Sequence, residues 1–338
     1  MKNYISILVL LLVVHGCSSD SSNNGQSGVD LGGTNIGGAD VSTVPDADDS
    51  SDAGVDVGTE DMAVVDVGPD GSVEDAGEPP PFGGDRPAKI VLPQDYDAAK
   101  QYPLVTLLHG YGATGAIQDS FLGLSANVTA RQFILIVPDG TVDSGGRRFW
   151  NATNFCCDFQ NTGIDDQTYL MGLVDEAIET YSIDESAIFF MGHSNGGFMS
   201  YTLACEFGDR IAGIASLAGT SHVQEEACPD TGDVSILQIH GTLDETIAYA
   251  GSGFFPGAVE VAERWAARNE CDAPVDGDNI DFDTAIVGDE TTVRRWQNGS
   301  NGTDVELWTI ETAGHIPSGI ATTFAPMVLD HLFARKKP

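Results

Sequence analysis

FFMGHSNGGFMS, residues 189–200, is the stretch that decides how the rest of the chain is interpreted. An apolar run from Ile188 to Met191 predicts a buried strand, and the residues after the motif predict a helix. Ser194 therefore falls in a tight turn between the two, and Gly192 and Gly196 carry no Cβ atoms to collide there. In a chain with 40 glycines the G-x-S-x-G pattern also arises by chance, so its meaning depends on the rest of the sequence.

The charge of the chain is strongly one-sided. It has 51 acidic and 15 basic residues among 338, and residues 18–85 hold 16 of the acidic residues with no Lys or Arg. Residues 86–338 keep 35 acidic against 14 basic residues, so this part is acidic as well. Such a surface repels phosphate backbones and anionic headgroups, which argues against a nucleic-acid partner.

The first 17 residues predict an export signal. Lys2 is followed by an apolar run from Ile5 to Val14, which is too short to span a bilayer, and then by Val14-His15-Gly16-Cys17. The segment resembles a bacterial lipoprotein signal, and the resemblance implies cleavage before Cys17 and a lipid on its sulfur. Ser18 then favours the outer membrane over the inner one. The lipoprotein prediction implies that the protein contacts the membrane only through this lipid. The alternative is an ordinary secretory signal.

Residues 18–85 predict a disordered acidic linker, because low hydrophobicity with one sign of charge cannot offset the entropy of ordering. Its repeated D-V-G and D-A-G units suggest calcium, but no EF-hand loop closes among them. The domain organisation predicted is thus a signal over residues 1–17, a linker over 18–85 and one catalytic domain over 86–338.

Five cysteines remain beyond Cys17. An exported protein meets an oxidising compartment, so some of the five should pair, while the odd number leaves at least one unpaired. We expect Cys205 and Cys228 to take part and Cys271 to be left over. Cys156 and Cys157 are adjacent, and adjacent cysteines more often pair with distant ones than with each other.

Apolar runs alternate with amphipathic segments from Arg86 onward. This alternation predicts right-handed crossovers and a mostly parallel sheet with helices on both faces. Helices are predicted over 167–181, from the motif to 206, over 257–269 and over 320–335, with Asp165 or Asp166 as the first N-cap. Strands are predicted over 89–92, 104–108, 133–137, 188–191, 211–217, 234–239 and 305–310.

Three candidate residues follow the carboxyl ends of predicted strands, where an open parallel sheet places its reactive groups. They are Ser194, Asp244 in IHGTLDE and His315 in ETAGHIP, in the chain order of α/β-hydrolases. A serine hydroxyl needs an imidazole to take its proton, and the imidazole needs a carboxylate to orient it. His315 is therefore the candidate base and Asp244 its partner, with Glu245 and Asp283 as alternative acids.

The remaining histidines of the folded region are less suitable. His222 precedes Asp244 and breaks the order, and His331 lies on the closing helix. His193 and His240 stand at strand ends and are predicted to be packed or hydrogen-bonded.

An acyl transfer also needs donors for the oxyanion. The backbone N–H of Asn195, directly after the serine and at a helix N-terminus, is one candidate. The N–H of Tyr111, in the loop His109-Gly110-Tyr111-Gly112 after an early strand, is the other. No metal or organic cofactor is expected.

Several blocks together carry a resemblance to a known family. They are PLVTLLHGYG (103–112), VPDG (137–140), FWNATNFCC (149–157), GIDD (163–166), MGHSNGGFMSYTLACEFGDRIAGIASLAG (191–219), IHGTLDETIAY (239–249), ERWAARNEC (263–271) and AGHIPSG (313–319). With these blocks the chain resembles polyhydroxybutyrate-depolymerase-like and feruloyl-esterase-like lipoprotein esterases, which are α/β-hydrolases related to family-one carbohydrate esterases. The resemblance implies the triad Ser194, Asp244 and His315.

Two departures from that family stand out. Relatives often carry a cysteine near residue 298 to pair with the one in RNxC, and this chain has Gln297-Asn298-Gly299, which fits an unpaired Cys271. They also tend to have Gly-His-Thr-Trp-Pro at the histidine, where this chain has Gly-His-Ile-Pro, so an altered pocket edge is expected.

The leading hypothesis is an exported, lipid-anchored or secreted serine esterase that works through an acyl-enzyme. The ester substrate would be a feruloyl or acetyl ester of plant polysaccharide, or a short hydroxyalkanoate ester as in polyesters. Trp150, Phe155 and Tyr111 are either an aromatic wall for an aryl acid or parts of the core, and the core is favoured. The alternatives are a peptidase of the prolyl-oligopeptidase type and a non-catalytic surface-binding lipoprotein on a hydrolase scaffold.

Overall fold

A computed structural model describes residues 81–338. The predicted signal, the lipidation site Cys17 and nearly all of the predicted linker lie outside the described residues. Among the described residues, the N–H of Gly83 donates to Glu176 at 2.9 Å.

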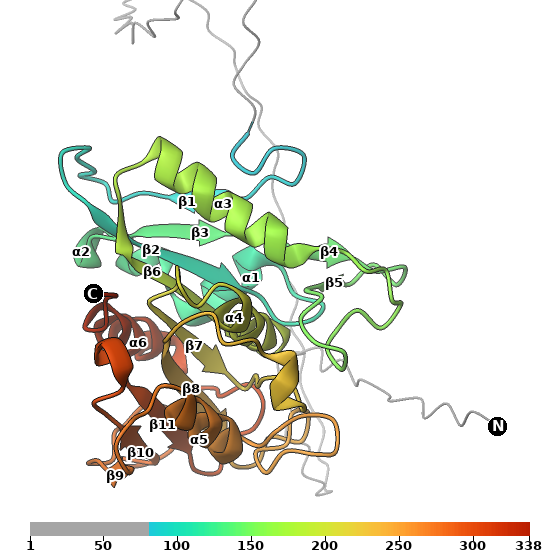
Figure 1. Ribbon diagram of the computed structural model, residues 1–338, viewed down its shortest axis with the longest axis vertical. Helices are drawn as coiled ribbons and strands as arrows, with labels where there is room; N and C mark the ends of the chain where they lie inside the picture. Colours follow the sequence, from blue (N-terminus) through green and yellow to red (C-terminus); the bar gives the residue numbers. More distant parts are fainter. Residues whose placement is uncertain (1–80) are drawn as a thin grey trace, which may run out of the picture. The chain divides into compact units, whose positions relative to one another are not determined.

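Nine strands form one sheet in the order β1-β3-β2-β6-β7-β8-β11-β10-β9 (Figure 1). The six central strands are parallel. At the edges the pairing is antiparallel, with β1 against β3, β10 against β11, and β9 against β10. The strands of this sheet are β1 (Lys89–Val91), β2 (Tyr102–Leu108), β3 (Ile134–Val137), β6 (Ile183–His193), β7 (Gly213–Leu217), β8 (Ser235–Gly241), β9 (Val275–Asp276), β10 (Thr291–Trp296) and β11 (Val305–Ile310). A separate hairpin joins β4 (Thr141–Val142) to β5 (Arg148–Phe149).

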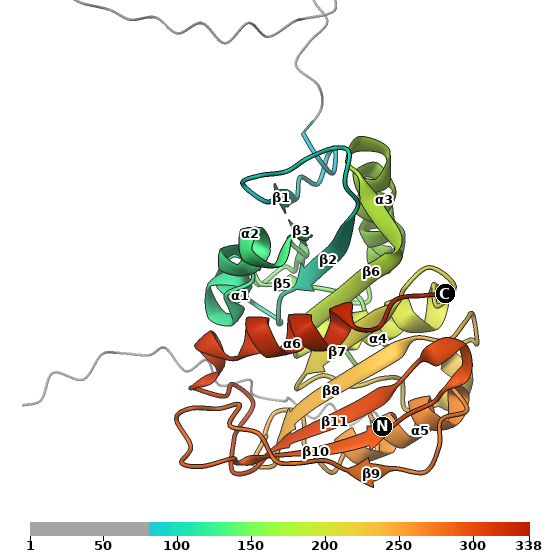
Figure 2. The same ribbon diagram turned by 90° about the vertical axis from the view of Figure 1, so that its left-hand side faces the viewer.

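Helices cover both faces of the sheet, so two hydrophobic cores form (Figure 2). The helices packed against one face are α3 (Asp166–Thr180), α4 (Asn195–Glu206) and α5 (Ala258–Arg268). Those against the other face are α1 (Gly115–Leu122), α2 (Val128–Arg131) and α6 (Phe324–Phe333). Short 3-10 turns occur at Ser125–Asn127, Glu225–Ala227, Ser300–Gly302 and Ile320–Thr322. Within residues 81–338 no helix is long and apolar enough to cross a bilayer.

The predicted mostly parallel sheet with helices on both faces is confirmed, and the differences are local. The strand before Ser194 starts at Ile183 rather than Ile188. Its first residue pairs with Tyr102 of β2, and a register shift separates this pair from the rest of the ladder. The closing helix starts at Phe324 rather than Ile320, because Ile320–Thr322 form a 3-10 turn instead. Directly after that turn, Thr323 donates its hydroxyl to Phe282 O. Strand β10 and helix α1 were not predicted.

The cysteine pairing corrects one expectation. Cys205 pairs with Cys228 and Cys271 is free, as predicted, but Cys156 and Cys157 are bonded to each other and not to distant cysteines. Once Cys205 and Cys228 pair with each other, a single cysteine remains elsewhere in the described chain, and one cysteine cannot serve two partners. Both cysteines of the adjacent pair are buried in the hydrophobic core that also contains side chains of α4.

Candidate active site

Ser194 occupies the turn between β6 and α4 in a strained backbone conformation with a positive φ, at φ 54° and ψ −118°. A Cβ atom at Gly192 would collide with the backbone of Gly196, and one at Gly196 would collide with the carbonyl of Leu108. The two glycines therefore allow the serine backbone to bend sharply over β2. Ser194 is partly exposed although its neighbours on both sides are buried, so its hydroxyl is open to a ligand.

Asp244 and His315 lie in the loops after β8 and β11, two neighbouring strands of the sheet. Their side chains meet, with His315 Nδ1 2.7 Å from Asp244 Oδ2. The other carboxylate oxygen, Oδ1, accepts the backbone N–H groups of Thr246 and Ile247, each at 2.8 Å. Burial alone would raise the pKa of Asp244, but hydrogen bonds from His240 and His315 outweigh burial and hold that pKa well below its usual range. The carboxylate therefore stays ionised.

His193 brings the loop of His315 next to the elbow. Its Nε2 lies 2.9 Å from the carbonyl oxygen of His315, and because a carbonyl only accepts, Nε2 carries the proton. The two imidazole rings are 4.9 Å apart between centroids. Burial lowers the pKa of His193 to about 3, so this ring is neutral and serves as a donor. Ser194 Oγ itself makes no hydrogen bond to His315 in the described structure, a contact that in unliganded enzymes often tightens only with substrate.

The two predicted oxyanion donors belong to segments next to the serine, the loop after β2 and the first residue of α4. A Cβ built on Gly110 would stand 3.5 Å from the Cβ of Ser194, which places the loop of Tyr111 directly beside the elbow. Within residues 81–338 the backbone N–H groups of Tyr111 and Asn195 have no hydrogen-bond partner. Both groups are thus free to bind an anionic oxygen.

The side chain of Asn195 joins the elbow to the loop after β5. Its Oδ1 accepts the N–H of Trp150 at 2.8 Å, and its Nδ2 donates to the carbonyl of Trp150 at 2.9 Å and to Cys156 Sγ at 3.4 Å. Trp150 is fully buried and donates its indole N–H to His109 O, so it belongs to the core and not to an aromatic wall. Tyr111 is partly buried, and its hydroxyl donates to Asp143 at 2.6 Å.

The alternative acids do not approach His315. Glu245 is exposed, and no hydrogen bond or ion pair of its side chain occurs among the described residues. Asp283 is buried and accepts the backbone N–H groups of Ala285 and Ser318, which supports the segment after the histidine. The structure therefore brings Asp244, and neither alternative, to the imidazole.

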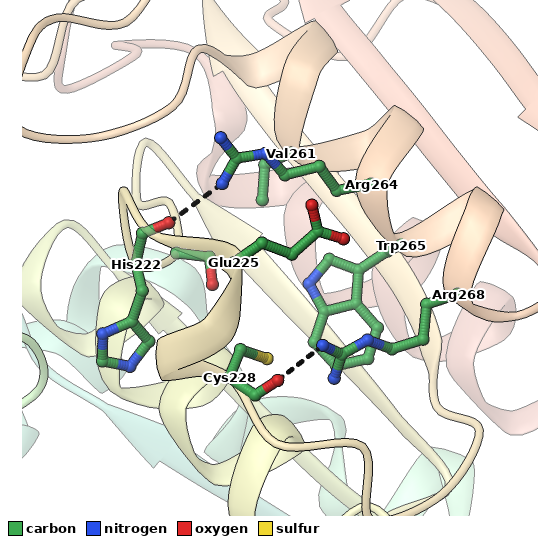
Figure 3. Close-up of a pocket in the computed structure, with 8 residues that line it drawn as sticks. His222, Glu225, Cys228, Val261, Arg264, Trp265 and Arg268 are labelled. Carbon is green, nitrogen blue, oxygen red and sulfur yellow. Dashed lines mark hydrogen bonds between the residues drawn. The ribbon is translucent and has the colours of Figure 1, made fainter.

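His222 lines a small pocket between the segment 221–228 and α5 (Figure 3). The figure shows Arg264 donating to the carbonyl of His222 and Arg268 donating to the carbonyl of Cys228. Both guanidinium groups are used to fix this segment to the helix. We therefore interpret this pocket as part of the packing between segment 221–228 and α5, beside the Cys205–Cys228 disulfide.

Large apolar side chains are exposed around the carboxyl edge of the sheet. Six of the eight exposed large hydrophobic residues among positions 81–338 lie in segments that follow β2, β3, β8 or β11, at the same end as Ser194. They are Ile117, Val142, Phe159, Leu243, Phe254 and Ile316. We call these six residues the apolar rim. Phe254 stacks on Phe155 with ring centroids 5.6 Å apart and an interplanar angle of 18°, so the rim joins two loops beside the elbow.

Sequence reasoning missed how the non-triad histidines contribute. His193 and His240 were predicted only as packed or hydrogen-bonded residues, yet each contacts a member of the candidate triad. The signal available was their position at the ends of β6 and β8, immediately before the functional loops. That position indicates proximity but not the partner.

Comparison with known proteins gives a consistent result. The family described as Phospholipase/Carboxylesterase matches residues 93–255. A probable feruloyl esterase C from Aspergillus niger is 28% identical over 189 residues, which cover 54% of this chain and 61% of that protein. Feruloyl esterase D from Neurospora crassa is 25% identical over 269 residues, 75% of this chain and 83% of that protein. The solved structure of an acetyl xylan esterase from Aspergillus awamori aligns with a TM-score of 0.52 at 18% identity, covering 70% of this chain and 93% of that one.

The fold of the chain is that of the α/β-hydrolase class, as predicted. Within that class it resembles carboxylesterases, among them feruloyl esterases, and this predicted resemblance is confirmed. In two curated relatives the match spans only 43% and 61% of the relative's length. The activity and substrate of the chain are therefore taken up as proposals.

Proposed function

We propose that the chain is a serine esterase that hydrolyses carboxylic esters through an acyl-enzyme. The observation that carries this proposal is the 2.7 Å hydrogen bond between His315 and Asp244, formed at the same edge of the sheet as the Ser194 elbow. Their chain order and their places at strand ends agree with those of α/β-hydrolases.

Each residue then has one task. Ser194 Oγ attacks the ester carbonyl carbon while His315 takes the hydroxyl proton, and Asp244 stabilises the charged imidazole that results. The backbone N–H groups of Tyr111 and Asn195 bind the oxyanion. His315 passes its proton to the leaving alkoxide, which departs as an alcohol and leaves the acyl group on Ser194. Water, activated by the same imidazole, adds to the acyl carbon, and the free acid leaves as the proton returns to the serine.

Two features of the surface support an ester that joins an apolar acyl group to a hydroxylated polymer. The apolar rim offers contacts to an acyl chain or an aryl acid. A groove of about 360 Å³ along β10 and β11 has a different character, since it is lined mainly by hydroxyl, amide and charged side chains. They include Thr242, Tyr249, Asn279, Thr292, Arg294 and Thr309. We therefore favour feruloyl or acetyl esters of polysaccharide over hydroxyalkanoate esters.

The test compares the wild-type chain with Ser194→Ala on p-nitrophenyl acetate and butyrate. Ser300→Ala, which alters a serine outside the candidate site, is the matched control. We expect the Ser194 variant to fall to the uncatalysed background while the control keeps wild-type rates. Equal rates for wild type and Ser194→Ala would rule out the proposed activity. A peptide hydrolysed faster than any ester would favour a peptidase.

A second set of assays ranks the substrates. Methyl ferulate, acetylated xylan and hydroxybutyrate oligomers differ in acyl group and in the polymer that carries it. The highest kcat/KM is expected on methyl ferulate or acetylated xylan. A preference for hydroxybutyrate oligomers would reverse the assignment of the substrate while leaving the esterase mechanism in place.

We also propose that the esterase is exported and tethered to the outer membrane or cell surface through a lipid on Cys17. This proposal rests on the signal and lipobox pattern at residues 1–17 and on the acidic segment that follows. Mass spectrometry of the mature N-terminus should find an acylated Cys17, and Cys17→Ser should release the enzyme from membranes. An unmodified and freely soluble wild-type product would contradict it.

A further inference from the structure

A chain of buried polar side chains leads from Asp244 through His240 and Gln238 to Tyr201. His240 Nε2 lies 3.1 Å from Asp244 Oδ2 and 2.8 Å from the carbonyl oxygen of Ile247. His240 Nδ1 lies 3.1 Å from Gln238 Nε2, and Gln238 Oε1 accepts the hydroxyl of Tyr201 at 2.8 Å. The side chains of Tyr201, Gln238 and His240 are all at most 1% exposed.

The directions of these hydrogen bonds are determined by one backbone carbonyl. Gln238 Nε2 lies 2.9 Å from Gly219 O, which can only accept, so the NH2 group of the amide must face it. The same NH2 group faces His240 Nδ1. An amide nitrogen donates and does not accept, so Nδ1 must present its lone pair. Tyr201 then donates to the amide oxygen, and every group in the chain is satisfied.

The proton of His240 is therefore on Nε2. This N–H is directed at two acceptors of the same turn, the carboxylate of Asp244 and the carbonyl of Ile247. Ile247 in turn donates its own backbone N–H to Asp244 Oδ1 at 2.8 Å. One imidazole thus holds both ends of the turn that carries the carboxylate. Tyr249 packs edge-on against the ring, with centroids 5.7 Å apart, and closes the remaining side.

The carboxylate of Asp244 is consequently held from three directions. Its Oδ1 is fixed by two backbone N–H groups, and its Oδ2 is shared between His240 and His315. A carboxylate free to rotate would offer His315 a variable acceptor. Misplacement of a catalytic group by about 1 Å costs up to about 10²-fold in rate.

We propose that His240, in the tautomer selected by Gln238, is a positioning residue that holds Asp244 in the orientation needed by His315. The proposal rests on the function proposed above, because it assigns Asp244 and His315 to the reaction. Gln238 acts one step further back, since its amide decides which nitrogen of His240 carries the proton.

Three variants of the full chain test the role of His240 in catalysis. His240→Leu removes the donor, and we expect kcat on p-nitrophenyl acetate to fall by about 10- to 100-fold with KM changed by less than about twofold. In His240→Gln an amide N–H can reach the place of Nε2–H, and most of the lost kcat should return. Gln238→Leu removes the tautomer selection, and a smaller loss of kcat than in His240→Leu is expected. Exposed Gln160→Leu is the matched control and should behave as wild type.

A spectroscopic measurement tests the tautomer without using activity. In the ¹⁵N spectrum of histidine-labelled protein, His240 should show a protonated Nε2 and an unprotonated Nδ1. The low-field proton signal of the His315–Asp244 hydrogen bond should persist in His240→Gln and broaden or disappear in His240→Leu. Thermal unfolding of each variant identifies any that fail to fold, and the wild-type spectrum remains informative in that case.

Three results would overturn the proposal. They are wild-type kcat in His240→Leu, no better activity in His240→Gln than in His240→Leu, or an Nδ1-protonated His240 in the wild type. If the wild type hydrolyses no ester, the proposed function fails instead. The tautomer and the low-field signal still report whether His240 holds Asp244.

Discussion

The two loops that meet beside Ser194 are fixed in different ways. The loop over residues 150–165 is held from other elements, because Asn195 binds Trp150 and Cys156, and Asp166 accepts the N–H of Asn151 while it pairs with Arg86 at 2.6 Å. In the loop over residues 242–257, the turn that carries Asp244 is held by His240 and by its own backbone N–H groups. The rest of that loop is joined to other elements, for example through the N–H of Leu243 to Ala313 O and the hydroxyl of Thr220 to Pro256 O. Changes in the second loop should therefore affect chemistry first, and changes in the first loop should affect stability first.

The largest expected effect is on the second loop. Asp244→Asn keeps the shape of the side chain but offers His315 the wrong partner, and in a comparable triad the same change lowers kcat by about 10⁴-fold. We expect a loss of that order on p-nitrophenyl acetate. Glu245→Gln is the matched control, since it alters the adjacent carboxylate, and it should retain wild-type kcat. A large loss in Glu245→Gln with little loss in Asp244→Asn would reassign the acid.

The two disulfides add a comparison of their own, because Cys205–Cys228 closes a loop of chain and Cys156–Cys157, in the first loop, does not. Cys205 and Cys228 are 23 residues apart, and replacing both with serine should lower the free energy of unfolding by about 3 kcal/mol on the chain-entropy estimate. Cys156 and Cys157 are adjacent and restrict the unfolded chain very little. Their double serine variant should lose clearly less stability in urea unfolding. Equal losses from the two pairs would show that loop closure is not what distinguishes them.

Asn195→Ala breaks the attachment of the first loop. The variant leaves the buried N–H of Trp150 without its acceptor, so we expect a loss of about 1–3 kcal/mol in the free energy of unfolding. The backbone N–H of residue 195 is unchanged, and kcat should fall far less than in Asp244→Asn. Asn279→Ala, at an exposed position, is the control for urea unfolding. A loss in kcat as large as that of Asp244→Asn would mean that the first loop also determines the chemistry.

The smallest expected effect is on the pH dependence of stability, through a carboxylate near the first loop. A hydrogen bond from Tyr111 is the main cause that lowers the pKa of Asp143 from 3.8 to about 2, and backbone N–H groups add to it. A lowered folded pKa stabilises the protein above pH 3.8, and that contribution is lost as the pH falls toward 2. In Asp143→Asn the melting temperature should therefore decline less between neutral pH and about pH 3. If the melting temperature of the variant falls as steeply as that of wild type, other carboxyl groups cause the loss of stability at acid pH.

Local patterns explain which features could be predicted. The elbow around Ser194 and the helix N-cap at Asp165 are specified by neighbouring residues, and the sheet follows from alternating apolar runs. Strand β10, with the sequence TTVRRW, was missed because Arg294 and Arg295 obscure its apolar side. In the structure Arg294 pairs with Asp276 of β9 and Arg295 with Glu306 of β11. The role of His240 was missed for a different reason. Its partners Gln238, Asp244 and Ile247 are close to it in the sequence. The amide of Gln238, however, is oriented by Gly219 and Tyr201 on other elements, and no local pattern indicates that orientation.

The positive φ at Ser194 also has a consequence for evolution. A non-glycine residue held in such a conformation costs about 1–3 kcal/mol, a substantial part of the 5–15 kcal/mol that keeps a typical domain folded. A lineage that no longer needed the reaction would gain stability by replacing this serine with glycine. Retention of serine at this position among descendants of the chain would therefore indicate selection for chemistry rather than for folding.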